Sequence, residues 1–213
     1  MNNKRLDGKT GFPQKTGLYD PANEKDSCGV GFVAHIKGEA SHQIMEDAYH
    51  VNSRMDHRGG CGFEENTGDG AGILTALPHS FFTTIAQDLN ISLPAQGGYA
   101  VGNIFLPQDE QERALCRATI ERIIIEEGQN FLAWRDVPID PLKADVGLAA
   151  LAAMPVIEQL FVSASEENQQ DQAAFDRALY IIRRRLTETL RRDSGLNQPE
   201  MLYACSLSPK VIV

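Results

Sequence analysis

Three residues near the start of this 213-residue sequence have side chains suited to chemistry. Cys28 begins the first apolar stretch, Arg58 lies in Asp-His-Arg-Gly-Gly-Cys-Gly (56–62), and Asp69 lies in Thr-Gly-Asp-Gly-Ala-Gly (67–72). A cysteine thiolate is a nucleophile, and a planar guanidinium can hold a carboxylate in two parallel hydrogen bonds. The glycines allow the backbone to approach a ligand closely. These three are the candidate site residues, with Asp69 facing the substrate pocket.

Each candidate also has a structural interpretation. Cys28 can be a small buried side chain at the start of a strand, and Arg58 can form a salt bridge beneath a glycine-rich loop. Asp69 is equally suited to stabilising a turn through its side chain. The Gly-Asp-Gly-Ala-Gly run does not predict a phosphate-binding loop, because no lysine follows it and it leads into an apolar, strand-like stretch.

The two motifs together resemble the start of the glutamate synthase large subunit, whose amino-terminal domain is a class II glutamine amidotransferase of the Ntn-hydrolase type. Trp-Arg-Asp-Val-Pro (134–138) and Tyr-Ala-Cys-Ser-Leu-Ser (203–208) extend the similarity over residues 18–213. The resemblance implies that Cys28 is the nucleophile and that Arg58 binds the α-carboxylate of glutamine. Gly60 is a departure, because the family usually has alanine there. Trp134 and Arg135 are expected to pack against and orient a neighbouring loop rather than react.

The resemblance further implies that Cys28 becomes the amino terminus once residues 1–27 are removed. Its α-amine, with an ordinary pKa near 7.7–8.0, could then accept the thiol proton. While Ser27 remains attached, this nitrogen is an amide and cannot act as a base. Residues 1–27 are polar and rich in Gly, Pro and Asn, as expected of an exposed leader that is easily cut. Residues 28–213 are then the first part of the amidotransferase domain.

The family's oxyanion-stabilising Asn-Gly pair and its acidic residue for the substrate amine come later than Val213, and this sequence contains no Asn-Gly. Together with a terminal strand pattern at 211–213, this predicts a fragment that is inactive alone. No cofactor is expected in this chain. The resemblance implies FMN and an iron–sulfur cluster in further synthase domains, with an electron-donating small subunit or ferredoxin as partner. Two alternatives to the glutaminase function remain. The chain could be a stand-alone, non-catalytic glutamine-binding or regulatory module, or it could be an Ntn amidase that acts on a different amide.

Composition restricts the other classes of function. The net charge is −9, from 29 acidic and 20 basic residues, which disfavours a nucleic-acid or anionic-membrane surface. No apolar run reaches the roughly 18–20 residues that span a bilayer, and no secretory signal is evident. The four cysteines are far apart and form no Cys-x-x-Cys pair, so no metal site or disulfide framework is predicted. We expect a cytoplasmic protein that takes glutamine as its ligand.

The apolar patterns predict alternating strands and helices. A strand from Cys28 to Ile36 is followed by a helix capped by Ser41, whose apolar face is Ile44, Ala48, Val51 and Met55. Further strands are expected at 73–77, 99–106, 131–137 and 156–163, helices at 78–89, 109–128 and 169–193, and two short strands within 201–213. The resemblance implies an α+β fold, the αββα four-layer Ntn-hydrolase sandwich with mainly antiparallel sheets, incomplete at the carboxyl end.

Overall fold

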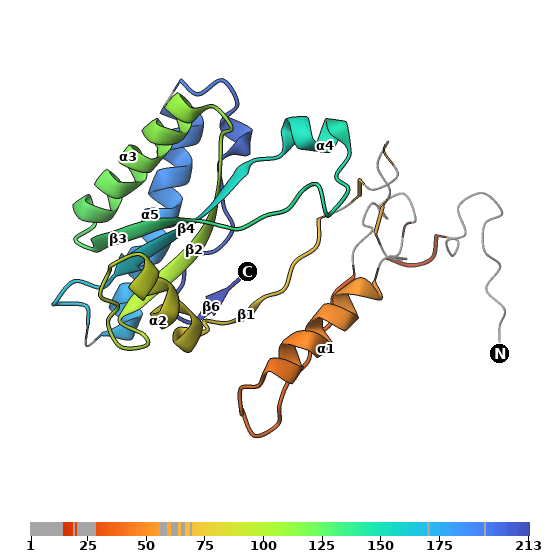
Figure 1. Cartoon of the computed structure of the whole chain (residues 1–213), viewed down its shortest axis with the longest axis horizontal. Coiled ribbons are helices and arrows are strands. Elements are labelled where there is room, and N and C mark those ends of the chain that lie inside the picture. Colours follow the sequence, from red (N-terminus) through yellow and green to blue (C-terminus); the bar gives the residue numbers. More distant parts are fainter. Residues whose placement is uncertain are drawn as a thin grey trace. The chain divides into compact units, whose positions relative to one another are not determined.

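The computed structural model describes residues 15–18, 20, 29–55, 59–60, 64, 67–68, 70–169, 171–193 and 195–213. The chain divides into two compact units (Figure 1). The first comprises residues 1–63 and 68–70, and the second comprises residues 64–67 and 71–213. Within the described ranges, no helix combines the length and apolar character needed to cross a bilayer.

A four-stranded antiparallel sheet forms the centre of the second unit. Its strands lie in the order β3–β4–β2–β5, with β2 at Tyr99–Leu106, β3 at Asn130–Asp136, β4 at Val156–Ser163 and β5 at Tyr203–Ala204. The two central strands pair along their whole length, from Tyr99 opposite Ser163 to Leu106 opposite Val156. Both are largely buried, which explains their nearly continuous apolar sequence. The strand predictions for 99–106 and 156–163 are confirmed.

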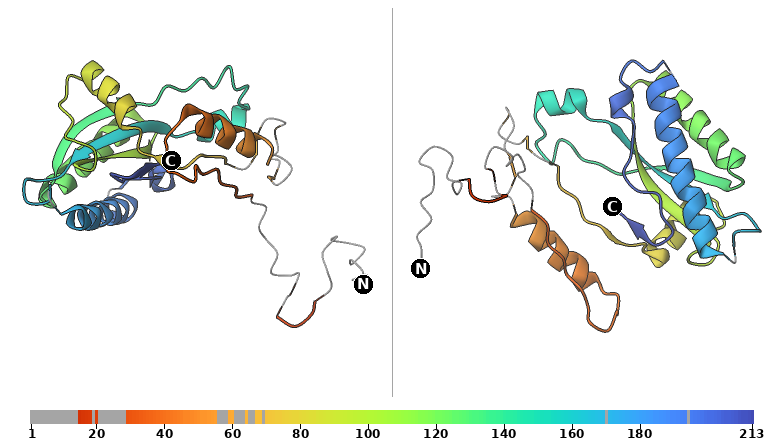
Figure 2. Two further views of the ribbon diagram at one scale, coloured as in Figure 1. Left: turned by 90° about the horizontal axis from the view of Figure 1, so that it is seen from below. Right: turned by 180° about the vertical axis from the view of Figure 1, so that it is seen from behind.

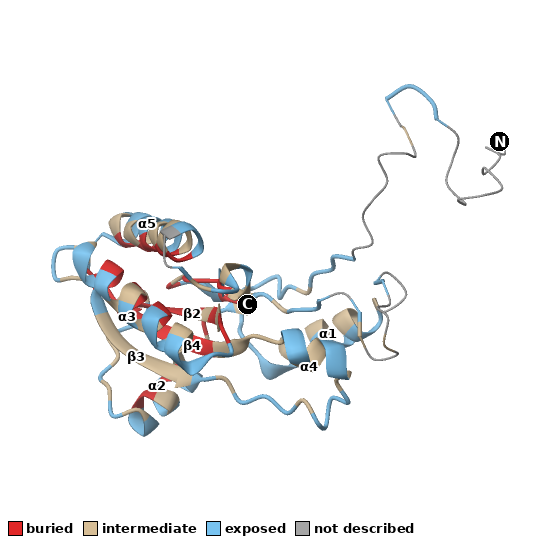
Figure 3. Cartoon of the chain, turned by 90° about the horizontal axis from the view of Figure 1, so that it is seen from above, coloured by how far each residue is buried: buried red, intermediate tan, exposed pale blue. Residues whose placement is uncertain are grey.

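Helices α3 (Glu110–Glu126) and α5 (Gln172–Glu188) cover one face of this sheet (Figure 2). The side chain of Asp109 caps α3 by accepting hydrogen bonds from the N–H groups of Gln111 and Glu112 at 3.0 and 2.9 Å. Buried residues lie on both helices and on the central strands of the sheet (Figure 3). This main core includes Ile120, Ile124, Leu160, Val162, Phe175 and Ile182.

A second, smaller core lies on the opposite face of the sheet. Helix α2 (His79–Asp88) packs there, beside an antiparallel pair formed by β1 (Thr75–Ala76) and β6 (Val211–Ile212). The left view in Figure 2 shows α2 and α5 on opposite sides of the sheet. This core contains Leu77, Phe82, Tyr99, Val101, Phe161 and Ile212. The mixed helical content and antiparallel pairing confirm the expected α+β class.

Three local details differ from the expected elements. The two short strands near the carboxyl end join different sheets, because β5 pairs with β2 whereas β6 pairs with β1. Helix α5 begins at Gln172 and passes into a π-helical turn, η3, at Thr189–Asp193. A short helix, α4 (Leu148–Ala153), follows β3 and was not predicted.

The first unit contains helix α1 (His42–Ser53), with Ser41 at its N-cap position as expected. Its apolar face is half-buried, and none of its residues is fully buried. The strand expected up to Ile36 is wrong for the residues described, because 29–35 have no strand pairing. Val30 and Phe32 are 92% and 91% exposed. Alternating apolar residues favour an extended backbone, but a strand also needs a hydrogen-bonding partner, and none of the described residues provides one.

Candidate functional site

The three candidate site residues, Cys28, Arg58 and Asp69, lie outside the described residues. The structure does describe residues on both sides of each, including the segment from Gly29, helix α1, Gly60 and Gly68. The site can therefore be built from the contacts of these flanking residues.

The segment that follows Cys28 packs against the helix that leads to Arg58. A Cβ atom at Gly31 would lie 2.6 Å from Cγ1 of Val51 and 3.4 Å from Cε of Met55. Only glycine allows this approach without displacing Val51. Gly31 comes three residues after Cys28, and Met55 comes three residues before Arg58. Within the first unit, the segment just after Cys28 is thus in contact with the helix end that comes just before Arg58.

The two glycine-rich motifs also meet. A Cβ atom at Gly68 would lie 2.7 Å from the carbonyl oxygen of Gly60, so the two backbones touch where a side chain would not fit. Gly60 follows Arg58 by two residues, and Gly68 immediately precedes Asp69. The close approach explains why this motif has glycine at position 68.

Glu64, between these two glycines in sequence, binds the start of α4 inside the second unit. Its Oε1 accepts a hydrogen bond from the Ala149 N–H at 2.9 Å, and its Oε2 accepts from the Ala150 N–H at 3.3 Å. The Thr67 hydroxyl donates to Oε2 at 3.0 Å. The hydrogen bond from Ala149 is the main cause that lowers the pKa of the Glu64 carboxyl, and partial desolvation opposes it.

Sequence reasoning did not single out Glu64. Helix α4 begins after Gly147, which offers no capping side chain, so its first N–H groups need an acceptor from elsewhere. That signal shows that a cap is needed but cannot identify a residue 85 positions earlier.

The two described cysteines are not poised as nucleophiles. Cys116 is fully buried in α3, and burial raises the pKa of its thiol to about 11. Burial also raises the pKa of Cys205, which is half-buried. Both thiols therefore stay protonated at neutral pH. Among the residues that the structure describes, no group of three His, Cys, Asp or Glu side chains is arranged to hold a metal ion.

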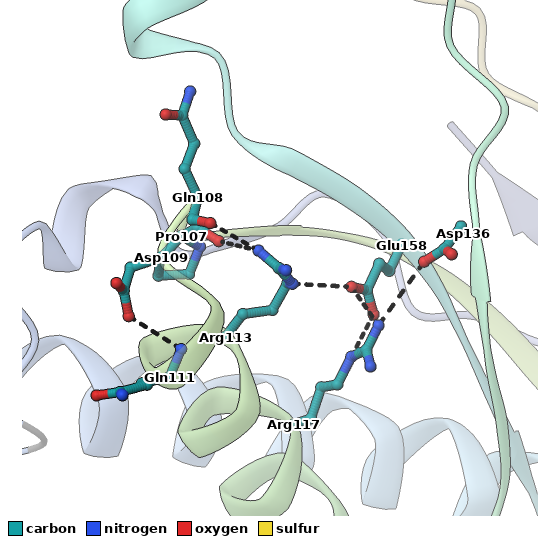
Figure 4. Close-up of polar contacts among 8 residues, drawn as sticks. All are labelled: Pro107, Gln108, Asp109, Gln111, Arg113, Arg117, Asp136 and Glu158. Atoms are coloured by element: carbon teal, nitrogen blue, oxygen red, sulfur yellow. Dashed lines mark hydrogen bonds and ion pairs between the residues drawn. The ribbon is translucent and has the colours of Figure 1, made fainter.

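A cavity of about 520 Å³ between α3 and the sheet is lined by an ion-pair network (Figure 4). Arg117 binds Glu158 through two hydrogen bonds of 2.7 and 2.5 Å, and Arg113 lies 3.8 Å from the same carboxylate. Arg113 also donates to the carbonyl oxygens of Pro107 and Gln108. The charged groups are paired with one another, so this network connects α3 to β4 and has a structural role.

Trp134 and Arg135 make packing and orienting contacts on opposite faces of β3. The Trp134 indole N–H donates to Glu121 at 2.8 Å, on the side of α3. Arg135 donates to Gln159 at 2.6 Å, and its guanidinium lies 5.8 Å from the ring centre of Phe81 in α2. The two side chains therefore pack against helices and a strand, and not against the loop that was expected.

Comparison with known proteins identifies the family. The model of the class II glutamine amidotransferases matches residues 28–213. The chain belongs to this family. The described α+β architecture with antiparallel pairing fits the Ntn-hydrolase type of this domain.

Several glutamate synthases are similar to this amidotransferase chain. The glutamate synthase [NADPH] large chain of Bacillus subtilis is 38% identical over 202 residues, which are 95% of this chain and 13% of that protein. The glutamate synthase [NADH] of Schizosaccharomyces pombe is 36% identical, over 95% of this chain and 9% of that protein. Ferredoxin-dependent glutamate synthase 1 of Arabidopsis thaliana is 37% identical, over 94% of this chain and 12% of that protein. The chain thus spans only about a tenth of the length of these relatives.

Proposed function

We propose that this chain is the glutaminase part of a glutamate synthase and that Cys28 is its nucleophile. The observation that carries the proposal is the extent of the family match, which begins at Cys28 and continues to Val213. The similarity to glutamate synthases from bacteria, fungi and plants supports the synthase assignment. Residues 1–27 are then a leader whose removal frees the α-amine of Cys28.

The reaction is the hydrolysis of the glutamine side-chain amide. The freed α-amine takes the proton of the Cys28 thiol, and the thiolate attacks the amide carbon. The resulting ammonium group returns a proton to the departing nitrogen, the C–N bond breaks, and ammonia leaves a glutamyl thioester. Water then attacks the thioester, releasing glutamate and restoring the thiol.

Arg58 and Asp69 hold the substrate in this scheme. The Arg58 guanidinium binds the α-carboxylate through its planar fork, and Asp69 faces the same pocket. The contact between Gly60 and Gly68 supports this assignment, because each of these glycines lies within two residues of a candidate. Packing of Gly31 against Val51 and Met55 likewise supports the proximity of Cys28 and Arg58.

Further synthase domains would use the ammonia. In a synthase it would convert 2-oxoglutarate reductively to glutamate, with electrons from a small subunit or ferredoxin. The described residues do not fit an iron–sulfur cluster, because they contain no suitable ligand group and Cys116 is enclosed in the core. We propose that FMN and an iron–sulfur cluster are held by other domains of a synthase. These 213 residues also lack an Asn-Gly pair, and the loss of one oxyanion donor typically costs about 10²–10³ in rate. We expect them to be inactive alone.

The test is glutamine hydrolysis by the natural protein purified from its own cells, with variants expressed in the same cells. Cys28→Ala should abolish ammonia release because the nucleophile is gone. Arg58→Lys should raise the KM for glutamine because a point charge replaces the two-pronged fork. Cys205→Ala is the matched control, since its thiol is protonated and outside the proposed chemistry. Glutamine binding without hydrolysis by the unaltered protein would instead support a regulatory module.

A further inference from the structure

Helix α3 has apolar side chains on both of its faces. Its inner face is buried in the main core. On the opposite face, the spacing of three, four and three residues places Leu115, Ala118, Arg122 and Ile125 along one line, which we call the α3 stripe. Leu115 is exposed, and Ile125 is 66% exposed. A helix with apolar residues all round is normally covered on all sides, so the α3 stripe is suited to contact with another surface.

Acidic side chains flank the α3 stripe. Helical geometry places Glu112 and Glu126 along one side of it and Glu110 and Glu121 along the other. The basic residue within the stripe, Arg122, is paired with Glu126 at 2.5 Å. The other two arginines of α3 reach inward to the sheet. The outer face of α3 is thus apolar at its centre and acidic at its edges.

Helix α5 presents the opposite charge on its outer face. Tyr180 is 65% exposed, and Ile181 beside it is also exposed. Arg177 and Arg184 each lie three or four residues from both of them, so the four side chains form one patch, the α5 stripe. Within the described part of the chain Arg177 is in no ion pair, and Arg184 lies 3.4 Å from Glu188. The α5 stripe therefore combines apolar surface with positive charge.

The two helices form one outer layer in which they run in opposite directions. Gln129, just after α3, accepts a hydrogen bond from the Ser165 N–H, which precedes α5, at 3.1 Å. Glu112, at the start of α3, accepts one from the Asn197 N–H, which follows α5, at 3.1 Å. The end of each helix thus lies near the start of the other. The layer carries an acidic, apolar stripe beside a basic, apolar one.

We propose that the outer layer of α3 and α5 is the interface for a second copy of this chain. A two-fold axis parallel to the helices places the α3 stripe of each copy opposite the α5 stripe of the other, and the four helices form an antiparallel bundle. The interface is isologous, because the two stripes contact each other twice.

Charge favours this arrangement over the alternatives. Opposing α3 with α5 brings acidic residues to basic ones and covers the exposed apolar side chains of both helices. Packing α3 on α3 of the second copy would bring acidic edges together, and packing α5 on α5 would bring arginines together. The layer is complementary to itself, which is the property that an interface between identical copies requires.

The size of the layer indicates a weak dimer. Each helix has 17 residues and is therefore about 25 Å long. Two such helices about 10 Å apart can bury on the order of 1,200 Å² over both copies, which is the lower end of the range for specific interfaces. We expect a dissociation constant of roughly micromolar order.

The test uses the natural full-length protein with one charge introduced on either stripe. Ile125→Lys adds a positive charge that faces the arginines of α5 in the second copy, and Tyr180→Glu adds a negative charge that faces the acidic edges of α3. Each variant alone should raise the dissociation constant, measured by sedimentation equilibrium, by at least about tenfold. Leu142→Glu is the matched control, because it adds a charge at an exposed leucine outside the layer and should change nothing.

Mixing the two variants tests which helices face each other. In a mixed dimer the added lysine faces the added glutamate across one contact, and the other contact is unaltered. An equimolar mixture should therefore regain most of the affinity that each variant loses. A mixture that stays dissociated would contradict the opposition of α3 and α5. If Ile125→Lys does not fold, Leu115→Lys on the same stripe takes its place.

Two further results would overturn the proposal. Unchanged dissociation constants in both variants would place any contact between copies elsewhere on the molecule. An unaltered protein that is monomeric at roughly 100 μM, well above the expected dissociation constant, would show that no second copy binds. If Ile125→Lys and Tyr180→Glu then lower the Tm more than Leu142→Glu does, another part of the same polypeptide covers the layer.

Discussion

At the scale of single residues, the Glu158 carboxylate shows how a buried charge is held. Only 1% of this side chain is exposed, and Arg117 binds both of its oxygens. The hydrogen bonds that Arg117 donates to Glu158 are the main cause that raises the pKa of Arg117. Figure 4 shows the two arginines of α3 reaching the same carboxylate on β4. A charge removed from water to this extent depends on its partners, because an unpaired buried charge is very unfavourable.

Arg117→Ala should therefore lower the free energy of unfolding by about 3 kcal/mol, at the lower end of the range for breaking a buried pair because Arg113 remains nearby. Arg122→Ala on the same helix is the matched control. Arg122 pairs with Glu126 in solvent, and losing that pair should cost less than about 0.5 kcal/mol. Urea denaturation of the two variants measures the difference, and equal losses would show that the burial of Glu158 has no energetic consequence.

At the scale of elements, capping determines where the helices begin. Helix α3 begins at a local cap, because the Asp109 side chain binds the N–H groups two and three residues ahead. Helix α4 has no local cap and depends on Glu64. The first arrangement can be read from neighbouring residues in the sequence, whereas the second requires the fold to bring distant residues together.

Asp109→Ala should destabilise the protein by about 1 kcal/mol, the typical cost of losing an N-cap. Gln111→Ala, at the exposed second residue of the same helix, should change stability by less than about 0.5 kcal/mol. Thermal or urea unfolding checks both values. An Asp109→Ala variant as stable as Gln111→Ala would mean that the cap contributes nothing measurable.

The elements predicted correctly are those whose own residues carry a strong apolar pattern. Strands 99–106 and 156–163 are rich in apolar residues because each is a central strand buried on both faces, and their bounds agree with the structure. The strand expected after Cys28 is wrong for the residues described, because alternation of Val30 and Phe32 does not specify a pairing partner. Pairing is a property of the tertiary fold.

The candidate site divides in the same way. Cys28, Arg58 and Asp69 were predicted from residue type and motif, and they lie outside the described residues, so their roles remain proposals. Glu64 could not be predicted, since its partner Ala149 is 85 residues away and contributes only its backbone. Motifs indicate candidate reactive residues, whereas a contact such as that between Glu64 and Ala149 becomes visible only in the fold.

At the scale of the whole molecule, the chain belongs to the class II glutamine amidotransferase family and corresponds to 9–13% of the length of the synthases compared with it. Each of its two units has a distinct character. The buried residues of the described part lie in the second unit, whereas Val30, Phe32 and Ile36 of the first are more than 90% exposed. The central claim, that Cys28 acts as an amino-terminal nucleophile, depends on what happens to residues 1–27.

Mass spectrometry of the natural protein from its own cells, giving its intact mass and its first residue, tests this claim most directly. We predict a protein that begins at Cys28 and is much larger than the 23.4 kDa of these 213 residues. A free α-amine on Cys28 would then be available as the base. A 23.4 kDa protein that retains residues 1–27 would contradict the account, because the nitrogen of Cys28 would remain an amide that cannot accept the thiol proton.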